Sequence, residues 1–197
     1  MSWSKIWDED HLWYQAVKAN MGGLPYHNVN HVTNLYKWYG ENNVPYNYDL
    51  DVATAFHDSV YDDKVNKEYR SVAFMLRVTD ATVSDKAVMG IMATETHLLP
   101  EKFDPVTVPI IMADVHRLGL GFTRIADFYS IMEESTRLYG ITEQEAARGS
   151  LEFMLNFLNT VRINATRKYE EVPDSSNFWN NIEAGVKAII REAAINL

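Results

Sequence analysis

Histidine and aspartate residues stand out in this sequence as candidate metal ligands. His57 and Asp58 are adjacent near the end of an apolar segment, and Asp114 follows a second apolar run. His27 and His31 lie four residues apart, a spacing that places them on one face of a helix. Because an uncompensated buried carboxylate is costly, acidic groups on apolar helices indicate a shared cation. Imidazoles and carboxylates together suit one borderline divalent ion, namely Mn²⁺, Fe²⁺, Co²⁺, Ni²⁺ or Zn²⁺.

Each of these features taken alone also has an ordinary structural explanation. A histidine pair at helical spacing is common on protein surfaces, and a His-Asp dipeptide often occurs by chance. An aspartate in an apolar helix can instead cap a neighbouring helix or pair with an arginine. His11 and His116 have no supporting sequence context, and we interpret them as structural. Only the combination of the other features indicates a metal site.

The composition limits the classes of function. None of the 197 residues is cysteine, which excludes disulfides, Cys-ligated zinc, iron–sulfur clusters and thiol catalysis. The formal net charge of −9 argues against long nucleic acid as a partner, because binding a phosphate backbone needs a basic surface. No apolar stretch approaches the length of a membrane span, and no signal-peptide core is recognisable. We therefore expect a cytoplasmic protein with no membrane partner.

Turn and capping signals divide the chain into segments of helix length. We predict helices at about residues 4–20, 27–38, 67–78, 84–98, 109–118, 122–139, 142–165 and 174–194. A further helix is expected to begin with Asp49 as its N-cap, and Thr142 with Glu145 forms a capping-box pattern. Trp7 and Tyr14, seven residues apart, are interpreted as core packing rather than as a docking face. No segment alternates with period two, so the sequence predicts a single all-α domain over residues 1–197.

Five short motifs follow one another in a recognisable order. They are YHNVNHV at 26–32, AFHDSVYD at 55–62, EYRSVA at 68–73, IMATETH at 91–97 and DVHRLG at 114–119. In this order they resemble one branch of the HD superfamily of metal-dependent phosphohydrolases. The resemblance covers about residues 26–160 and implies an HD-type helical bundle with a metal ion at its centre. The ligands it implies are His31, His57, Asp58 and Asp114.

The resemblance also directs attention to three residues around that centre. Glu68 could orient or deprotonate the attacking water, or fix a histidine ligand; an exposed glutamate at a helix start is the alternative. His27 could donate to a substrate phosphate or stack in the core. His97, on one predicted helix face with Thr94, could neutralise phosphate charge or assist the leaving group. We list Glu68, His97 and His27 as candidate catalytic residues.

The expected function is hydrolysis of a phosphate ester of a small molecule, such as a nucleotide, by a metal-activated water. A di-iron oxygenase of the HD type is one alternative, but it needs additional histidines between His57 and Asp114. The sequence offers only His97 there, which favours one metal ion. A non-catalytic, nucleotide-binding or regulatory HD protein is the other alternative. A homo-oligomer is left open, because helical bundles of this kind often associate.

Overall fold

The computed structural model describes residues 3–80, 82–172, 175–195 and 197. Within these residues the chain is helical, with one isolated β-bridge between Tyr169 and Val172 and no strand. This confirms the predicted all-α class. The chain divides into two compact units, residues 1–100 with 104–114 and residues 101–103 with 115–197. The single-domain organisation and the HD-type fold stay predictions.

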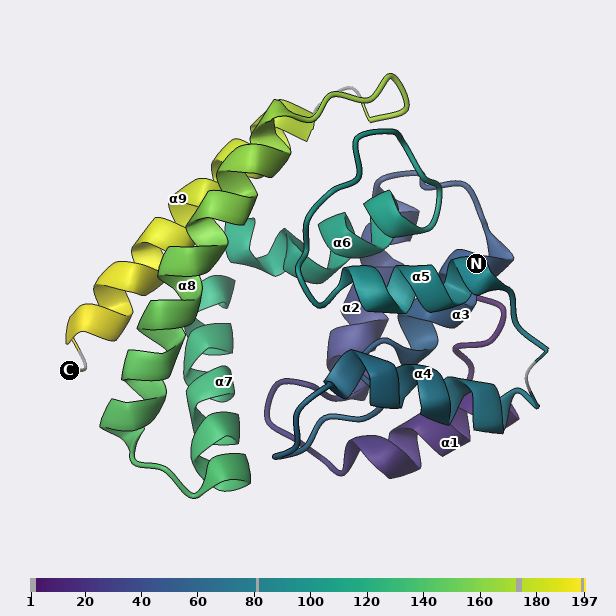
Figure 1. The fold of residues 1–197 in the computed structure, drawn as a ribbon, viewed down its shortest axis with the longest axis horizontal. Coiled ribbons are helices and arrows are strands. Elements are labelled where there is room, and N and C mark those ends of the chain that lie inside the picture. The colour runs from purple at the N-terminus through teal and green to yellow at the C-terminus, as the bar shows by residue number, and fades with distance from the viewer. Residues whose placement is uncertain (1–2, 81, 173–174, 196) are drawn as a thin grey trace. The chain divides into compact units, whose positions relative to one another are not determined.

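Unit 1, residues 1–100 with 104–114, contains the metal-ligand candidates. Its helices, labelled in Figure 1, are α1 (Leu12–Met21), α2 (Val29–Glu41), α3 (Tyr48–Phe56), α4 (Lys67–Val78), α5 (Asp85–Ala93) and most of α6 (Thr107–Val115). Two of these helices, the largely apolar α3 and α6, are buried over most of their length. Every residue of α3 from Leu50 to Phe56 is buried, and so is every residue of α6 from Val108 to Ala113. Helices that are apolar all round belong in a protein interior, so α3 and α6 form the core of this unit.

Close packing around the core depends on one glycine. Gly90 lies in α5, and a Cβ added there would meet Val106 Cγ1 at 2.7 Å and Ala53 Cβ at 3.0 Å. Non-bonded carbon atoms do not normally approach each other so closely. The absence of a side chain at residue 90 therefore allows α5 to pack directly against α3.

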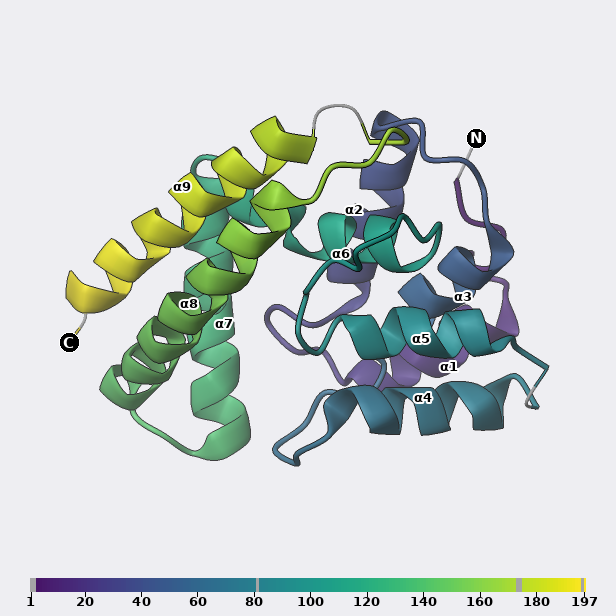
Figure 2. The same cartoon turned by 45° about the horizontal axis from the view of Figure 1, so that its top comes forward.

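Unit 2, residues 101–103 with 115–197, is built mainly from three long helices. It contains the short 3₁₀ helix η1 (His116–Gly119) and the helices α7 (Thr123–Tyr139), α8 (Glu143–Thr166) and α9 (Ser175–Ile195). Consecutive long helices lie side by side and run in opposite directions (Figures 1 and 2). Gly140, with φ 63°, ends α7 in the left-handed conformation, and the predicted capping box of Thr142 and Glu145 starts α8. Local turn signals therefore set the hairpin between α7 and α8.

Several predicted helix boundaries are wrong. The first helix begins at Leu12 instead of residue 4, because the Ser4 hydroxyl and the Lys5 amide donate to Asp51 at 2.5 and 2.8 Å. Asp49 is not the N-cap of α3; the side chain of Asn47 accepts the Leu50 amide instead. The predicted start at residue 174 lies outside the described residues.

Trp7 and Tyr14 pack edge to face with ring centroids 4.9 Å apart, in agreement with the core-packing interpretation.

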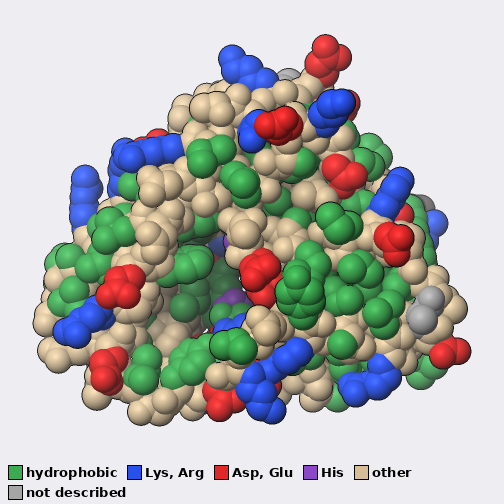
Figure 3. Space-filling model, in the orientation of Figure 1, with side chains coloured by type: hydrophobic (Ala, Val, Ile, Leu, Met, Phe, Trp, Pro, Cys, Tyr) green, Lys and Arg blue, Asp and Glu red, His purple; other side chains and the backbone are tan. Residues whose placement is uncertain are grey.

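Acidic and basic side chains are both scattered over the face that Figure 3 shows, between areas of apolar side chains. Among the described residues, no helix is long and apolar enough to cross a membrane.

Candidate metal centre

Two histidines of unit 1 are positioned by the ends of helices. His31 is the third residue of α2, whose N-cap Asn28 accepts the backbone amides of Asn30 and His31. His57 is the C-cap residue of α3 and keeps helical dihedral angles. Both imidazoles are buried, with exposed fractions of 4% for His31 and 1% for His57. The two rings therefore meet in a place that water hardly reaches.

Two carboxylates complete the group. Asp58 directly follows His57 after the end of α3, and Asp114 is the next-to-last residue of the buried helix α6. Their side chains retain only 16% and 12% of their exposure. A carboxylate so far removed from water needs a compensating positive charge. Asp114 thus interrupts an apolar run because its carboxylate faces the imidazoles of His31 and His57.

The ligand atoms of these four residues converge. His31 Nε2 lies 3.2 Å from Asp58 Oδ2 and 3.0 Å from Asp114 Oδ1. His57 Nε2 lies 3.0 Å and 3.6 Å from the same two oxygens, and 3.3 Å from His31 Nε2. All four ligand atoms lie within 4.8 Å of one another.

These separations fit one bound ion. At a ligand distance of about 2.1 Å, adjacent ligand atoms are about 3.0 Å apart in an octahedral site and about 3.4 Å apart in a tetrahedral site. The five separations given above run from 3.0 to 3.6 Å, a range that includes both values. The group of His31, His57, Asp58 and Asp114 could therefore hold a metal ion, as the sequence predicts.

A backbone carbonyl orients one of the two imidazoles. His57 Nδ1 lies 2.9 Å from the carbonyl oxygen of Thr54, to which it donates when Nδ1 carries the proton. That tautomer leaves the lone pair of Nε2 directed at the cluster, the arrangement found around metal-ligating histidines. Thr54 itself is held by Tyr39, whose hydroxyl lies 2.8 Å from the Thr54 hydroxyl. Neither Thr54 nor Tyr39 was singled out from the sequence, although the position three residues before His57 is where a helical carbonyl would come within reach.

The charges of the cluster shift the pKa of every member. Burial lowers the pKa of His31, but the hydrogen bonds and charges of Asp114 and Asp58 outweigh it and raise the pKa to about 9. The pKa of His57 is likewise raised, against the effect of burial, by the same two carboxylates. Burial would raise the pKa of both carboxyl groups, but the surrounding imidazoles hold it well below its usual range. Without an ion, positive imidazoles compensate the carboxylates; a divalent cation can take over this charge.

The structure brings His97 to the cluster, by a route other than the predicted one. The helix expected to run to residue 98 ends at Ala93, because the amide and the hydroxyl of Thr94 both donate to the carbonyl of Ile91. His97 therefore does not share a helix face with Thr94. It follows in the left-handed conformation, with φ 52°, and its Nε2 lies 2.8 Å from Asp114 Oδ2. This contact leaves Oδ1 of Asp114 to face His31 and His57.

His27 also lies beside the cluster. It precedes α2 instead of forming its first turn, and its ring centroid is 5.8 Å from that of His31. On its other side the ring stacks on Tyr61 at 3.5 Å, with an angle of 14° between the planes. The coulombic interaction with His27 is one of the causes that lower the pKa of Asp58. Tyr61 was part of the HD-like motif, but its contact with His27 could not be read from spacing.

Glu68 is less closely connected. It lies in the first turn of α4 and is half-buried. Among the described residues, no hydrogen bond or ion pair joins its carboxylate to the four metal-ligand candidates. Its catalytic role stays a prediction from the motif.

Comparisons with protein-family models, with curated proteins and with solved structures find no significant match to this chain. We therefore infer its function from the residues of the site and their geometry.

Proposed function

We propose that this protein is a metal-dependent phosphohydrolase that cleaves a phosphate ester of a small molecule, a nucleotide or a related phosphorylated metabolite. The observation that carries the proposal is the convergence of His31, His57, Asp58 and Asp114, whose ligand atoms lie within 4.8 Å of one another. The order of the HD-like motifs along the chain supports it. On this proposal the helical bundle of the protein is of the HD type.

A divalent ion supplies a lowered pKa for water and charge stabilisation for the phosphoryl oxygens. The chain contributes the surroundings of that chemistry. Thr54 fixes the tautomer of His57, and His97 holds the Asp114 carboxylate in place. His27 stands next to the cluster and donates to a substrate phosphate when protonated. Glu68 is proposed to orient the attacking water.

One ion is proposed rather than two. Within the described chain, a single group of histidine and acidic side chains meets the distance requirement for a metal site. His97, the additional histidine that a second ion would need, is engaged with Asp114. The geometry thus favours a mononuclear hydrolase over a di-iron oxygenase.

The test combines metal analysis with turnover. Purified protein, loaded separately with Mn²⁺, Fe²⁺, Co²⁺, Ni²⁺ and Zn²⁺, is assayed for phosphate release from a panel of nucleotides and other phosphoesters. We expect about one ion per chain and metal-dependent release from at least one substrate. Asp58→Asn should lose at least 100-fold in activity together with its bound ion.

Asp63→Asn is the matched control, because Asp63 is an exposed carboxylate in the same loop. It should keep both the ion and the activity. An Asp58→Asn protein with undiminished metal content would contradict the proposed centre. A fully loaded protein that releases no phosphate from the panel would contradict the proposed reaction.

A further inference from the structure

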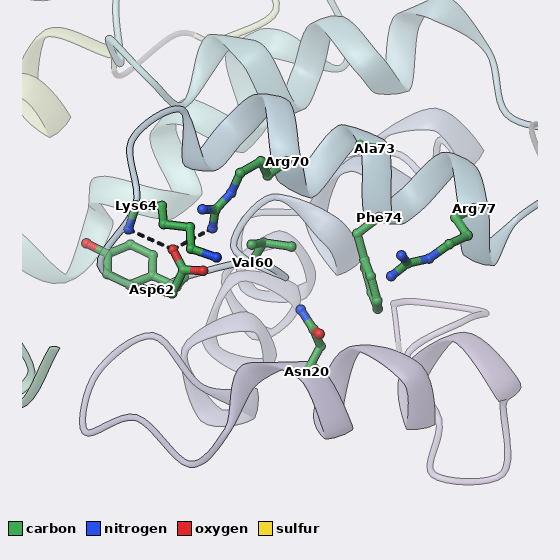
Figure 4. A pocket seen from close by; sticks show the side chains of 9 residues that line it. Asn20, Val60, Asp62, Lys64, Arg70, Ala73, Phe74 and Arg77 are labelled. Carbon is green, nitrogen blue, oxygen red and sulfur yellow. Dashed lines mark hydrogen bonds and ion pairs between the residues drawn. The ribbon is translucent and has the colours of Figure 1, made fainter.

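Unit 1 contains a pocket that none of the four metal-ligand candidates lines. Its volume is about 430 Å³, within the range of about 300–1,000 Å³ typical of small-molecule sites. Figure 4 shows it between α4, which carries Arg70 and Arg77, and α1, which carries Asn20. The segment from Val60 to Lys64 closes one end. The pocket is therefore built from two helices and the loop that follows the HD motif.

The pocket concentrates positive charge in an acidic protein. The whole chain has a formal net charge of −9, yet the pocket is lined by Lys64, Arg70 and Arg77 against a single carboxylate, Asp62. Arg70 and Arg77 are the only arginines among residues 1–114, and they lie two helical turns apart on one face of α4. A local excess of positive charge favours an anionic ligand.

The hydrogen-bonding capacity of Arg70 is only partly used. One terminal nitrogen, Nη2, donates to Asp62 Oδ1 at 2.5 Å. The buried Nε and Nη1 atoms have no hydrogen-bond partner among the described residues. Guanidinium groups bind phosphate through paired N–H donors, and buried donors without partners are uncommon in folded proteins. Arg70 thus lines the pocket with a positive charge and with donors that no acceptor of the protein uses.

The remaining wall offers an apolar surface. Phe74 lies between the two arginines along α4, and the Arg77 guanidinium carbon is 5.3 Å from the centroid of its ring. Val60 lines the same pocket (Figure 4). A ligand that combines a phosphate with a flat or apolar body would therefore find cationic side chains for its phosphate and the apolar surface for its body.

We propose that this pocket is a second binding site, for a phosphate-bearing small molecule of mononucleotide size. Binding there does not need the metal ion, so the proposal does not rest on the proposed hydrolysis. Tyr61 lines the pocket and also stacks on His27. The second site thus adjoins the metal centre and shares one side chain with its surroundings.

The test is calorimetric titration of the full chain, treated with chelator, with AMP and separately with inorganic phosphate. We expect AMP to bind with a submillimolar dissociation constant, and inorganic phosphate at least tenfold more weakly. Arg77→Gln should weaken AMP binding about tenfold. Arg77 is exposed and forms no ion pair among the described residues, so this substitution should leave the fold intact, as a circular-dichroism melt would show.

Lys37→Gln is the matched control. It removes one positive charge from the same unit, at a side chain that is 71% exposed on α2, and should change AMP binding less than twofold. Equal weakening by Arg77→Gln and Lys37→Gln would overturn the proposal, and so would a lack of AMP binding at millimolar concentration. Loss of AMP binding in Asp58→Asn but not in Arg77→Gln would place the ligand at the metal centre instead. Equal affinity for phosphate and AMP would overturn the assignment of a mononucleotide-sized ligand.

Discussion

At the scale of single residues, the candidate metal centre pairs two carboxylates with two imidazoles, whose positive charge can come from bound protons or be replaced by an ion. His31 has a pKa raised from 6.5 to about 9, and the pKa of Asp58 is held well below its usual range. A divalent ion needs neutral imidazoles as ligands, so binding must displace the protons that these groups otherwise carry. Affinity for the ion should therefore rise with pH.

The metal-free protein should lose stability as the pH rises. The folded pKa of His31 is above its ordinary 6.5, so the contribution of this group is fully present below pH 6.5 and is lost as the pH rises through about 9. The loss amounts to about 1.4 kcal/mol per pH unit for each proton. Denaturant unfolding in chelator at pH 6.5, 8 and 9 measures it.

Two comparisons make that measurement specific. His31→Gln should reduce the pH dependence over this interval, while His57, whose pKa is also raised, keeps part of it. The carboxylates have the opposite sign: their folded pKa lies below the usual 3.8, so their contribution is present above that value and is lost in acid. A free energy of unfolding that increases between pH 6.5 and 9 would contradict the charge balance described here.

His97 should act on the ion through Asp114. Its Nε2 holds Asp114 Oδ2 at 2.8 Å, and removing a partner of a ligating carboxylate typically weakens metal binding 10- to 100-fold. We expect a loss of this size for His97→Ala in a metal-competition titration. Glu95→Gln, at an exposed position in the same turn, should retain the original affinity. An unchanged metal affinity in His97→Ala would contradict the role of His97 in positioning Asp114.

At the scale of helices, the close approach at Gly90 is open to a direct test. A methyl group there would lie 2.7 Å from Val106 Cγ1, and overpacking of this kind costs about 1–3 kcal/mol. Gly90→Ala should lower the free energy of unfolding by that amount. Gly40→Ala is the control, because nothing lies within 4 Å of a Cβ at Gly40 in α2. It should be neutral or stabilising by up to about 1 kcal/mol, since alanine is the better helix former.

The sequence predicts the positions of the helices better than it predicts where each helix begins and ends. Apolar periodicity located the helices, and the motif order indicated four residues that the structure does bring together. Helix ends were less predictable, because tertiary contacts decide them. Asp49 and Asn47 are both capable N-caps, and only the structure shows that Asp49 accepts from Ser84 instead.

The positions of residues outside regular helices could not be predicted, for a related reason. The turn that places His97 beside Asp114 depends on a left-handed conformation, which no helical periodicity could reveal. The pocket beside α4 also joins Arg70 to a loop residue, Asp62. The seven-residue spacing of Arg70 and Arg77 places them on one face of a helix. The spacing does not predict which loop and which helix complete the pocket on the other side.

At the scale of the whole molecule, all four candidate ligands belong to unit 1. A ligand that binds only the folded form stabilises it, so added metal should slow hydrogen exchange in α2, α3 and α6. We expect this protection in a comparison of metal-loaded and chelator-treated protein by mass spectrometry. Asp58→Asn should show no difference between the two conditions. Protection confined to α7, α8 and α9 would contradict the assignment of the site to unit 1.

Unit 1 is interrupted along the chain, since residues 101–103 belong to unit 2 and residues 104–114 return to unit 1. A ribosome that has reached Pro100 has already produced three of the four ligands, but neither Asp114 nor the buried helix that carries it. The cluster of four candidate ligands therefore cannot form on a nascent chain until residue 114 has left the ribosome. If the cluster binds an ion, synthesis of α6 sets the earliest moment at which it can do so.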